Sequence, residues 1–500
     1  MSRTMVERST QLGRIRGFER LGVQTYLGLR YAEPAQRFQA SVQAQSPWEG
    51  IYDATTYRAS AAQVPILPEV YGPRPSAPRS EDCLFLNIHT PGTSSAVARP
   101  VIVFIHGGSF TGGGGNYYDG TALARGADAV VVSINYRLGV FAALDLAWLG
   151  TERDGGGQLW LGDQINALRW LRDNIGDYGG DPDLVTVIGE SAGAVSVAAL
   201  CAAPEAEGLV HRGVACSTGY ILPDEPSNDV VGKLARIRKC SRQQAIEFLR
   251  SASTDELIAL HKRGKALSPI PVCNTPLLPG RTEDLIRRRG ATAVPMIAGY
   301  ATNEGESLDL MLKLATRFPR ILLNLLSYFI ARAIAAHAAK GKANVPAYIR
   351  KLKKATRSIG FGRRFSDLVW TDGFRRGAME YAEETTRASS RGYVYVMDLP
   401  MRFAGQLIRS SHGIDLALTF NVWDDPEHTV PMFAEHPNAA VLAKRWVKML
   451  GHFARHGEPG DALGPWPVYG DGQRFSLRVS GEACVIEENV DALYREKVWQ

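Results

Sequence analysis

The chain has 500 residues, of which 45% are hydrophobic, 9% aromatic and 22% charged. This composition is typical of a globular protein with a large core and excludes a disordered or fibrous chain. The formal net charge of +6 is small for this length. No nucleic-acid motif or interleaved aromatic side chains accompany the basic residues, so we expect no nucleic-acid partner.

The first part of the chain is expected to be rich in strands. Residues 1–60 have the pattern of short strands joined by glycine turns, and a proline-rich loop follows at 64–78. Three apolar, β-branched runs then predict strands that are buried on both faces of a sheet: residues 83–91, 100–110 and 129–139.

Helices and strands alternate after these runs. Residues 163–180 place Ile165 and Leu168 at helical spacing and end at glycines, which is typical of an amphipathic helix. Residues 183–189 predict a strand, and residues 190–200 predict a helix. Because strands that alternate with helices pair in parallel, we expect an α/β fold with a large, mostly parallel central sheet and helices on both faces.

The middle of the chain is expected to be mostly helical. Residues 224–265 and 306–390 are interpreted as helical insertions that cover a pocket, whereas 294–300 and 391–400 predict further strands of the sheet. The most apolar helix, at 320–338, is too short and too polar to span a membrane. It is interpreted as a cover helix, with a core helix or an interfacial helix as alternatives.

Residues 1–500 are expected to form a single domain, because no repeat or low-complexity linker divides them. No apolar run reaches the roughly 20 residues that cross a bilayer, and the first residues lack a signal-peptide pattern. We therefore expect no stable membrane insertion and a cytoplasmic location. The basic stretch at 340–376 suits a solvated helical surface, with an anion- or membrane-facing patch as the alternative.

The run VTVIGESAGAVSV, at 185–197, contains a candidate nucleophile. A serine held at a sharp strand-to-helix turn needs very small residues two positions before and two after it, which Gly189 and Gly193 provide around Ser191. The turn would raise the Ser191 hydroxyl above the sheet, at the start of a helix whose free N–H groups favour negative charge. A purely structural glycine turn is the alternative interpretation.

A second glycine-rich stretch, IHGGSF at 105–110, follows a predicted strand. Attack on a carbonyl creates an oxyanion, which needs hydrogen-bond donors already in position. The backbone N–H groups of Gly108 and Ser109, with that of Ala192, are candidates for a three-donor oxyanion hole. A glycine loop that serves only to turn the chain is the alternative.

A serine nucleophile needs a base, and the base needs an orienting acid, in the chain order serine, acid, histidine. His412 is favoured because it lies in a short polar loop between strand-like and helix-like segments. Glu304 is favoured as the acid because it closely follows a predicted strand, but Glu306 and Asp309 are alternatives. The other histidines considered are His211, His261, His337, His428 and His436.

Several separate motifs now give a resemblance to a known family. They are SEDCLFLNI, HGGSF, NYRLG, DQINALRWLRDNIGDYGGDPDLVTVIGESAGAVSV, ATNEGES and HGIDL, in this order along nearly the whole chain. The sequence resembles the type B carboxylesterase/lipase family, the α/β-hydrolases that include bacterial para-nitrobenzyl esterases and the cholinesterases. The resemblance implies an α/β-hydrolase fold with helical insertions over the pocket.

The resemblance also implies an activity: hydrolysis of a small-molecule carboxylic ester through an acyl-enzyme, with no metal or cofactor. We expect a monomer or homodimer, and a loss of activity in acid with a midpoint within about a unit of the free histidine value near 6.5. The site residues that it implies are the triad Ser191, Glu304 and His412, the oxyanion donors Gly108, Ser109 and Ala192, and the supporting Glu190 and Ser217. A structural ion pair between Arg37 and Glu81 is implied as well.

Two other functions are considered. A carbamate or amide hydrolase would use the same triad, and a non-catalytic binding protein on this fold would lack a triad member, whereas all three are present. The sequence also departs from the family pattern. Cys83 has no earlier cysteine with which to form the family's extracellular disulfide, which favours a reducing compartment, and Trp160 stands where the family has a small residue. The six cysteines lack metal-site spacing, so neither a metal site nor a dense disulfide framework is expected.

Overall fold

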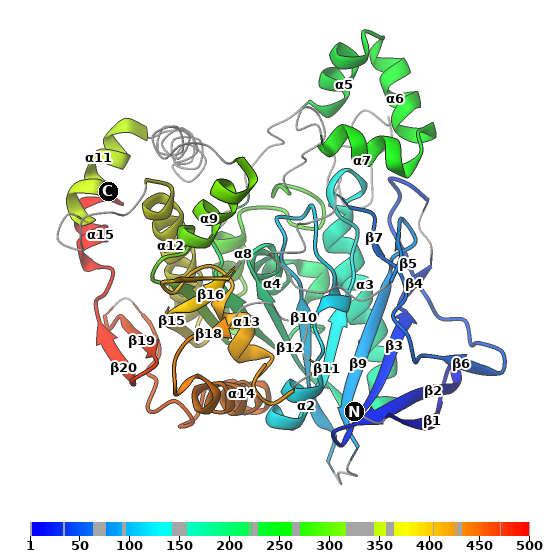
Figure 1. Cartoon of the computed structure of the whole chain (residues 1–500), viewed down its shortest axis with the longest axis horizontal. Helices are drawn as coiled ribbons and strands as arrows, with labels where there is room; N and C mark the ends of the chain where they lie inside the picture. Colours follow the sequence, from blue (N-terminus) through cyan, green and yellow to red (C-terminus); the bar gives the residue numbers. More distant parts are fainter. Residues whose placement is uncertain are drawn as a thin grey trace.

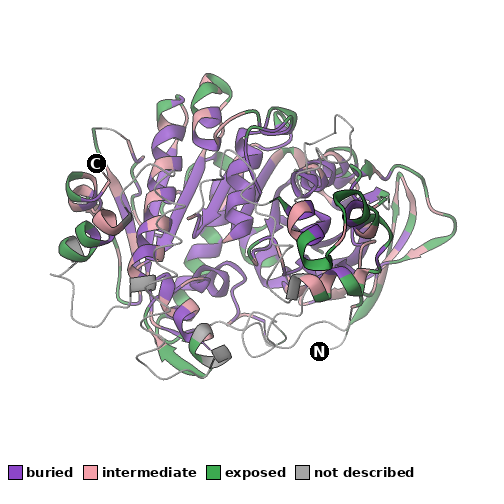
Figure 2. Cartoon of the chain, turned by 90° about the horizontal axis from the view of Figure 1, so that it is seen from above, coloured by how far each residue is buried: buried purple, intermediate pink, exposed green. Residues whose placement is uncertain are grey.

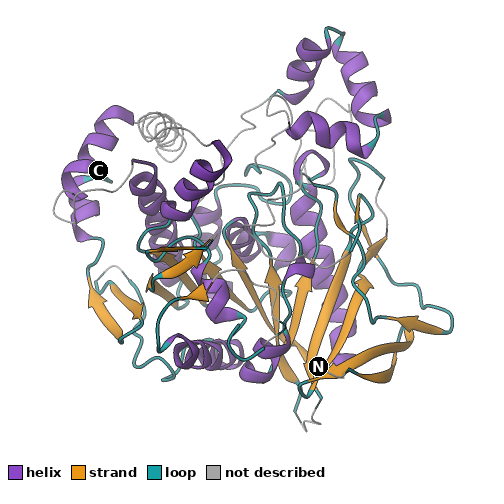
Figure 3. Cartoon of the chain, in the orientation of Figure 1, coloured by secondary structure: helices purple, strands orange, loops and turns teal. Residues whose placement is uncertain are grey.

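A central sheet runs through the molecule, with helices on both of its faces (Figures 1 and 3). The computed structural model describes residues 3–33, 36–63, 77–92, 97–142, 158–219, 222, 229–262, 271–316, 345–356, 365–403, 405–425, 427, 433–470 and 472–499. The apolar helix predicted at 320–338 and most of the proline-rich loop predicted at 64–78 lie outside these residues.

The sheet of the described residues has antiparallel strands at both edges and a parallel run between them. In spatial order its strands are β1 (Thr4–Thr10), β2 (Gly13–Arg20), β3 (Val23–Arg30), β9 (Phe85–Pro91), β11 (Val130–Ile134), β10 (Arg99–Ile105), β12 (Gly180–Glu190), β13 (Arg212–Cys216), β14 (Met296–Ala301), β15 (Gly392–Asp398), β19 (Phe475–Ser480) and β20 (Cys484–Glu488), with β6 (Ile51–Asp53) beside β2. The strands from β11 to β19 are parallel to one another. The predicted mostly parallel sheet is confirmed.

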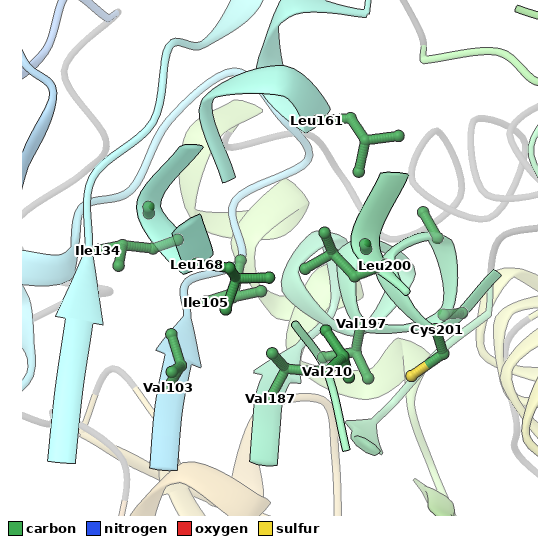
Figure 4. Packing of buried hydrophobic residues seen from close by; sticks show 14 of the residues in the cluster. Val103, Ile105, Ile134, Leu161, Leu168, Val187, Val197, Leu200, Cys201 and Val210 are labelled. Carbon is green, nitrogen blue, oxygen red and sulfur yellow. The ribbon is translucent and has the colours of Figure 1, made fainter. Parts of the chain in front are cut away.

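The apolar runs form central strands because their side chains are buried on both faces. Along β10, Val103 and Ile105 belong to one hydrophobic cluster, whereas Ile102 and Phe104 belong to a second cluster across the sheet. Successive side chains of a strand point to opposite faces, so an unbroken apolar run supplies both cores. Figure 4 shows Val103 and Ile105 beside Val187 of β12 and apolar side chains of the neighbouring helices.

Four described helices contribute to the first of these cores. They are α3 (Leu159–Asn174), α4 (Ala192–Ala202), α8 (Thr282–Arg288) and α12 (Phe365–Arg387). Helix α4 packs on β12 and β13, and α12 packs on β14 and β15. The second core is covered by α2 (Thr121–Ala127), α13 (Ile414–Thr419) and α14 (Ala439–His456). Burial is therefore concentrated in the sheet and in the helices beside it (Figure 2).

The remaining described elements lie around this centre. The helices are α5 (Val230–Arg238), α6 (Arg242–Ser251), α7 (Thr254–Lys262), α8 (Thr282–Arg288), α9 (Gly305–Thr316), α11 (Val345–Thr356) and α15 (Ala492–Lys497). The short strands are β4 (Ala32–Glu33), β5 (Val42–Gln43), β7 (Ser60–Ala61), β8 (Arg79–Ser80), β16 (Met401–Phe403), β17 (Gln406–Ile408) and β18 (Phe433–Ala434). None of the helices in the described ranges has the length and apolar character needed to cross a membrane.

Helices α5, α6 and α7 project from one end of the sheet, at the upper right of Figure 1. They share a small apolar cluster with Phe38 and Phe141. The Arg37 guanidinium donates to Glu81, as the resemblance implies, and also to the carbonyl oxygens of Leu249 and Ala252 at the end of α6. This ion pair therefore ties the projecting helices to the body.

Candidate active site

Ser191 lies at the sharp turn between β12 and α4. Its φ of 57° and ψ of −120° are a backbone conformation that residues with a side chain rarely adopt. A Cβ atom on Gly189 would collide with the carbonyl group of Gly193, and one on Gly193 would collide with the carbonyl oxygen of Ile105. The two glycines are therefore required sterically by the turn, as the Gly-x-Ser-x-Gly pattern predicts.

Gly193→Ala should disrupt this turn, because the new methyl group meets backbone that cannot move aside. We expect a destabilisation of about 3 kcal/mol or more, read as a fall in melting temperature, together with a loss of ester hydrolysis. Gly162→Ala in α3 is the matched control, because the nearest atom to its Cβ would be Leu277 Cδ1 at 3.6 Å. A Gly193→Ala protein that melts and turns over like the wild type would contradict this interpretation.

The loop after β10 passes beside the serine turn. A Cβ on Gly107 would lie 3.0 Å from Ser191 Cβ, and the next residues, Gly108 and Ser109, have φ values of 111° and 55°. Within the described part of the chain, the backbone N–H groups of Gly108, Ser109 and Ala192 donate to no protein acceptor. Unpaired N–H groups beside a hydroxyl are suited to receive an oxyanion.

Two buried side chains hold this loop, and the sequence analysis did not assign either of them a role. The His106 ring stacks on Tyr136 at 4.4 Å between centroids, and its Nδ1 lies 2.9 Å from the Gly107 carbonyl oxygen. Burial lowers the pKa of His106 to about 4, so the ring is neutral and donates to that carbonyl. Gln63 binds both the N–H and the carbonyl of Gly113. In the sequence, His106 stands beside two glycines that drew the attention, and Gln63 lies 50 residues before Gly113, so neither role could be inferred.

Glu304 follows β14 and is fully buried. Its Oε1 accepts hydrogen bonds from the Ala301 N–H at 2.6 Å and from the Ser217 hydroxyl at 2.8 Å. Its Oε2 lies 2.7 Å from His412 Nδ1. The structure therefore brings the predicted acid, the predicted histidine and the supporting serine together.

The loops that carry Glu304 and His412 are bound to each other and to α12. Asp367, at the start of α12, accepts from the Gly305 N–H at 3.1 Å and from the Asn303 side chain at 3.3 Å. Ser411 Oγ donates to the Glu304 carbonyl at 3.2 Å and accepts from the Ser307 N–H at 2.9 Å. These bonds fix the acid relative to the imidazole. Asp367 and Ser411, which take part in all of them, lie outside the motifs that drew attention in the sequence.

Two of the alternative acids and bases have other partners. Glu306 forms an ion pair with Arg409 at 3.0 Å, so its carboxylate is directed away from the imidazole. His211 accepts from the Val185 N–H at 3.2 Å, in the middle of β12 and away from Ser191 at its end. His337 and His428 lie outside the described residues.

The second nitrogen of His412 faces the carboxylate that precedes the serine. Nε2 lies 3.1 Å from Glu190 Oε1, and no hydrogen bond joins it to Ser191 Oγ, although both residues are described. Catalytic hydrogen bonds are often long in a free enzyme and tighten when substrate binds. Glu190 and Ser191 are adjacent in the chain, so the His412 imidazole lies beside the serine turn. Its Nε2 faces the Glu190 carboxylate, however, and not the Ser191 hydroxyl from which it would take a proton.

The charge state of His412 follows from these contacts. Burial disfavours the imidazolium, but the carboxylates of Glu190, Glu304 and Asp415 outweigh it and raise the pKa of His412 to about 9. Burial also raises the pKa of Glu190 to about 7, against the attraction of His412. The protonated imidazole paired with Glu190 is therefore the resting form at neutral pH, and the acid midpoint is expected above the 6.5 of a free histidine.

Aromatic rings surround the site. Phe374 of α12 packs on the His412 ring at 4.8 Å between centroids, and Trp370 stacks on Phe374 at 5.7 Å. Trp160, whose neighbours the sequence left open, packs against Phe110 of the loop after β10 at 4.9 Å. These rings restrict both the imidazole and the oxyanion loop.

A parallel sheet whose strand β12 ends at a serine turn, with an acid after β14 and a histidine after β15, has the architecture of an α/β-hydrolase. A family comparison agrees with this class. The chain belongs to the carboxylesterase family, whose model matches residues 4–497, and it is a carboxylic-ester hydrolase.

Individual relatives match over most of their length. The chain is 30% identical over 476 residues to carboxylesterase 1C of Rattus norvegicus, covering 89% of this chain and 84% of that protein. It is 29% identical over 522 residues to the para-nitrobenzyl esterase of Bacillus subtilis (strain 168), covering 98% of each. Among solved structures, a Geobacillus stearothermophilus carboxylesterase has a TM-score of 0.79 at 27% identity, covering 99% of this chain and 100% of that chain.

Proposed function

We propose that Ser191, His412 and Glu304 are the catalytic triad with which this carboxylic-ester hydrolase works. The observation that carries the proposal is the position of the His412 ring. Its Nδ1 is 2.7 Å from the buried Glu304 carboxylate, and its Nε2 is 3.1 Å from Glu190, the residue next to Ser191. A small rotation of the ring or of the serine side chain then directs Nε2 to Ser191 Oγ.

The first half of the reaction forms the acyl-enzyme. Neutral His412 takes the proton of Ser191 while Oγ bonds to the ester carbonyl carbon, whose π electrons move onto the oxygen. The N–H groups of Gly108, Ser109 and Ala192 stabilise that oxyanion, each contributing about 3 kcal/mol in the transition state. When the tetrahedral intermediate collapses, the C–O bond to the alcohol breaks and His412 gives its proton to the leaving oxygen.

Water completes the cycle by the same steps. His412 takes a proton from water as its oxygen attacks the acyl carbon, and returns that proton to Ser191 Oγ as the bond to the enzyme breaks. Glu304 holds the imidazole through Nδ1 and stabilises its positive charge in both halves. Glu304 is in turn held by Ser217 and Ala301.

Glu190 is proposed to set the pH at which this base becomes available. Below the pKa of His412 the imidazolium forms an ion pair with Glu190 Oε1, 3.1 Å from Nε2, and Nε2 has no lone pair to accept the Ser191 proton. Above that pKa the base is free. Activity should therefore rise with pH through the pKa of His412. Removing the Glu190 charge should lower that pKa, because an anion close to an imidazolium raises it.

Glu190→Gln is expected to shift the acid midpoint of kcat/KM downward by about one unit or more. Without the Glu190 charge the His412 imidazolium that forms in the transition state is less stabilised, so kcat at the alkaline plateau should fall by about tenfold. Glu306→Gln, two residues beyond the triad acid, is the control and should leave the midpoint in place. A Glu190→Gln profile that overlays the wild type, or moves to higher pH, would reject this role.

The substrate is proposed to be a small-molecule carboxylic ester rather than a carbamate or an amide. The relatives named above are called esterases, and the same triad serves all three chemistries. Nitrophenyl esters of rising acyl length, tested with a matched carbamate and anilide, give the preference. A burst of one nitrophenol per chain before steady turnover would support the acyl-enzyme, and its absence with slow deacylating substrates would oppose it.

Three further proposals concern the whole chain. We propose that residues 1–500 are a single α/β-hydrolase domain, with the helices α5 to α7 as one part of its pocket cover. We also propose a cytoplasmic location, because Cys83 is buried and unpaired and the six cysteines, all within described residues, form no disulfide. A monomer or homodimer is proposed, to be measured by sedimentation.

A further inference from the structure

A cavity of about 750 Å³ lies away from the triad, and its size is typical of sites for small organic molecules. The described residues that line it come from the ends of β3 and β9 and from the short strands β4, β6 and β8. Strands β3, β4 and β6 lie at the right of Figure 1, whereas α12, which packs on His412, lies at the left. Three strands separate β3 from β12, which leads to Ser191, so the two sites are about 19 Å apart at the usual strand spacing.

Aromatic rings form part of the cavity wall. Trp48 and Tyr52 lie 4.9 Å apart between ring centroids, at an angle of 43° between their planes. The Phe85 ring lies beneath the Arg30 guanidinium, at 4.5 Å. The other apolar residues of the described lining are Leu12, Ala44, Pro47, Ala59 and Pro78. These side chains give a flat, apolar ligand a surface on which to pack.

Two arginines of the wall, Arg58 and Arg79, have no carboxylate partner. Arg58 lies over the Tyr52 ring at 5.8 Å and donates to the backbone carbonyl oxygen of Asp53 at 3.4 Å. The Asp53 carboxylate instead accepts from the Thr55 hydroxyl at 2.6 Å. Within the described part of the chain, neither Arg58 nor Arg79 forms an ion pair, and both are exposed. Two guanidinium groups at one cavity are therefore available to an anion.

The charges of the wall favour an anion with a single negative charge. The described lining has three arginines and two acids, Glu33 and Asp82, so its net charge is +1. Both acids lie near the third arginine, Arg30, which pairs with the two oxygens of Asp82 at 2.7 and 2.9 Å. A phosphate with two charges would be repelled by these acids more strongly than a carboxylate. A carboxylate also fits the planar fork of a guanidinium group.

We propose that this cavity is a second ligand site and that it binds an aromatic carboxylate. Strand β7 pairs with β8 so that Ser60 lies opposite Arg79, which brings Arg58, two residues before Ser60, to the same wall as Arg79. These two arginines bind the carboxylate group, and the aromatic body packs on Trp48 and Tyr52. The site does not depend on the proposed triad, because the described lining contains none of the triad residues.

Titration calorimetry of the full chain with 2-naphthoate tests the proposal. The chain is first reacted with a serine-directed organophosphate until no esterase activity remains, so that binding at the catalytic serine is blocked. We expect one binding site with a dissociation constant of about 0.1 mM. The neutral 2-naphthamide, which keeps the rings, and acetate, which keeps the carboxylate, should each bind at least about tenfold more weakly. No detectable binding of 2-naphthoate, or equal affinities for 2-naphthoate and 2-naphthamide, would overturn the proposal.

Two substitutions locate the site on the molecule. Arg58→Gln and Arg79→Gln, both at exposed positions, should each weaken 2-naphthoate binding by about fivefold or more, with the melting temperature unchanged. Arg402→Gln is the control and should keep the wild-type affinity, because Arg402 is also exposed but pairs with Glu435 outside this cavity. Wild-type affinity in both Arg58→Gln and Arg79→Gln, or an equal loss in Arg402→Gln, would overturn the proposal even if Ser191 is the nucleophile.

Discussion

Ser191→Ala is expected to lower kcat by about a millionfold, equivalent to about 8 kcal/mol of transition-state stabilisation. The variant keeps the turn, the oxyanion donors and the imidazole, but it has no oxygen with which to form an acyl-enzyme. Because alanine is smaller than serine and Ser191 Oγ makes no hydrogen bond to His412, the fold should be unaffected. The measurement is hydrolysis of a nitrophenyl ester, with the melting temperature recorded beside it.

Ser476→Ala is the matched control for this loss. Ser476 is a buried serine on β19, and its hydroxyl has no hydrogen-bond partner within the described residues. Its removal should leave kcat within about threefold of the wild type. An unfolded Ser191→Ala protein would make the loss uninformative, whereas a folded protein that still turns over at wild-type rates would reject Ser191 as the nucleophile.

Glu304→Gln should lower kcat by about 10⁴-fold, because a neutral amide cannot replace the two acceptor oxygens and the negative charge of the carboxylate. Glu304 accepts from Ser217, Ala301 and His412. A glutamine has one side-chain oxygen, which can replace either Oε1 or Oε2 of Glu304 but not both. Its NH2 group must therefore face a hydrogen-bond donor at the other position. If that side is His412, the imidazole is held in the tautomer that has its proton on Nε2 and cannot act as a base.

The control for Glu304→Gln is Glu306→Gln. Glu306 lies two residues further along and pairs with Arg409 across 3.0 Å at a partly exposed position. We expect kcat within about threefold of wild type there, because exposed ion pairs contribute little. Comparable losses in the two variants would show that the loop, and not the Glu304 carboxylate, is responsible.

The central strands and the serine turn could be predicted because their causes are local. An unbroken β-branched run such as 100–105 fits a strand with two buried faces, and β10 is found there. The glycines around Ser191 are required by the backbone of the turn itself. The predicted strand at 129–139 is shorter in the structure, at Val130–Ile134. The side chain of Asn135, the next residue, binds the Gly115 N–H and the Asn116 side chain.

The polar contacts of the site could not be predicted, because residues far apart in the chain create them. Nothing near Asp415 indicates that it meets Ser217, which is 198 residues away. Glu304 and Glu306 are equally suitable acids in the sequence, and the path of the loop after β14 decides which of them contacts His412. The contact between Glu190 and His412 likewise exists only when β12 and the loop before α13 meet above the same sheet edge.

The most direct test of the triad is the mass of the protein and its peptides after reaction with a serine-directed organophosphate. We predict one adduct per chain, on the peptide that contains Ser191, and labelling that is slower by several orders of magnitude in His412→Ala. An adduct on a different residue, or labelling of His412→Ala at the wild-type rate, would contradict the triad.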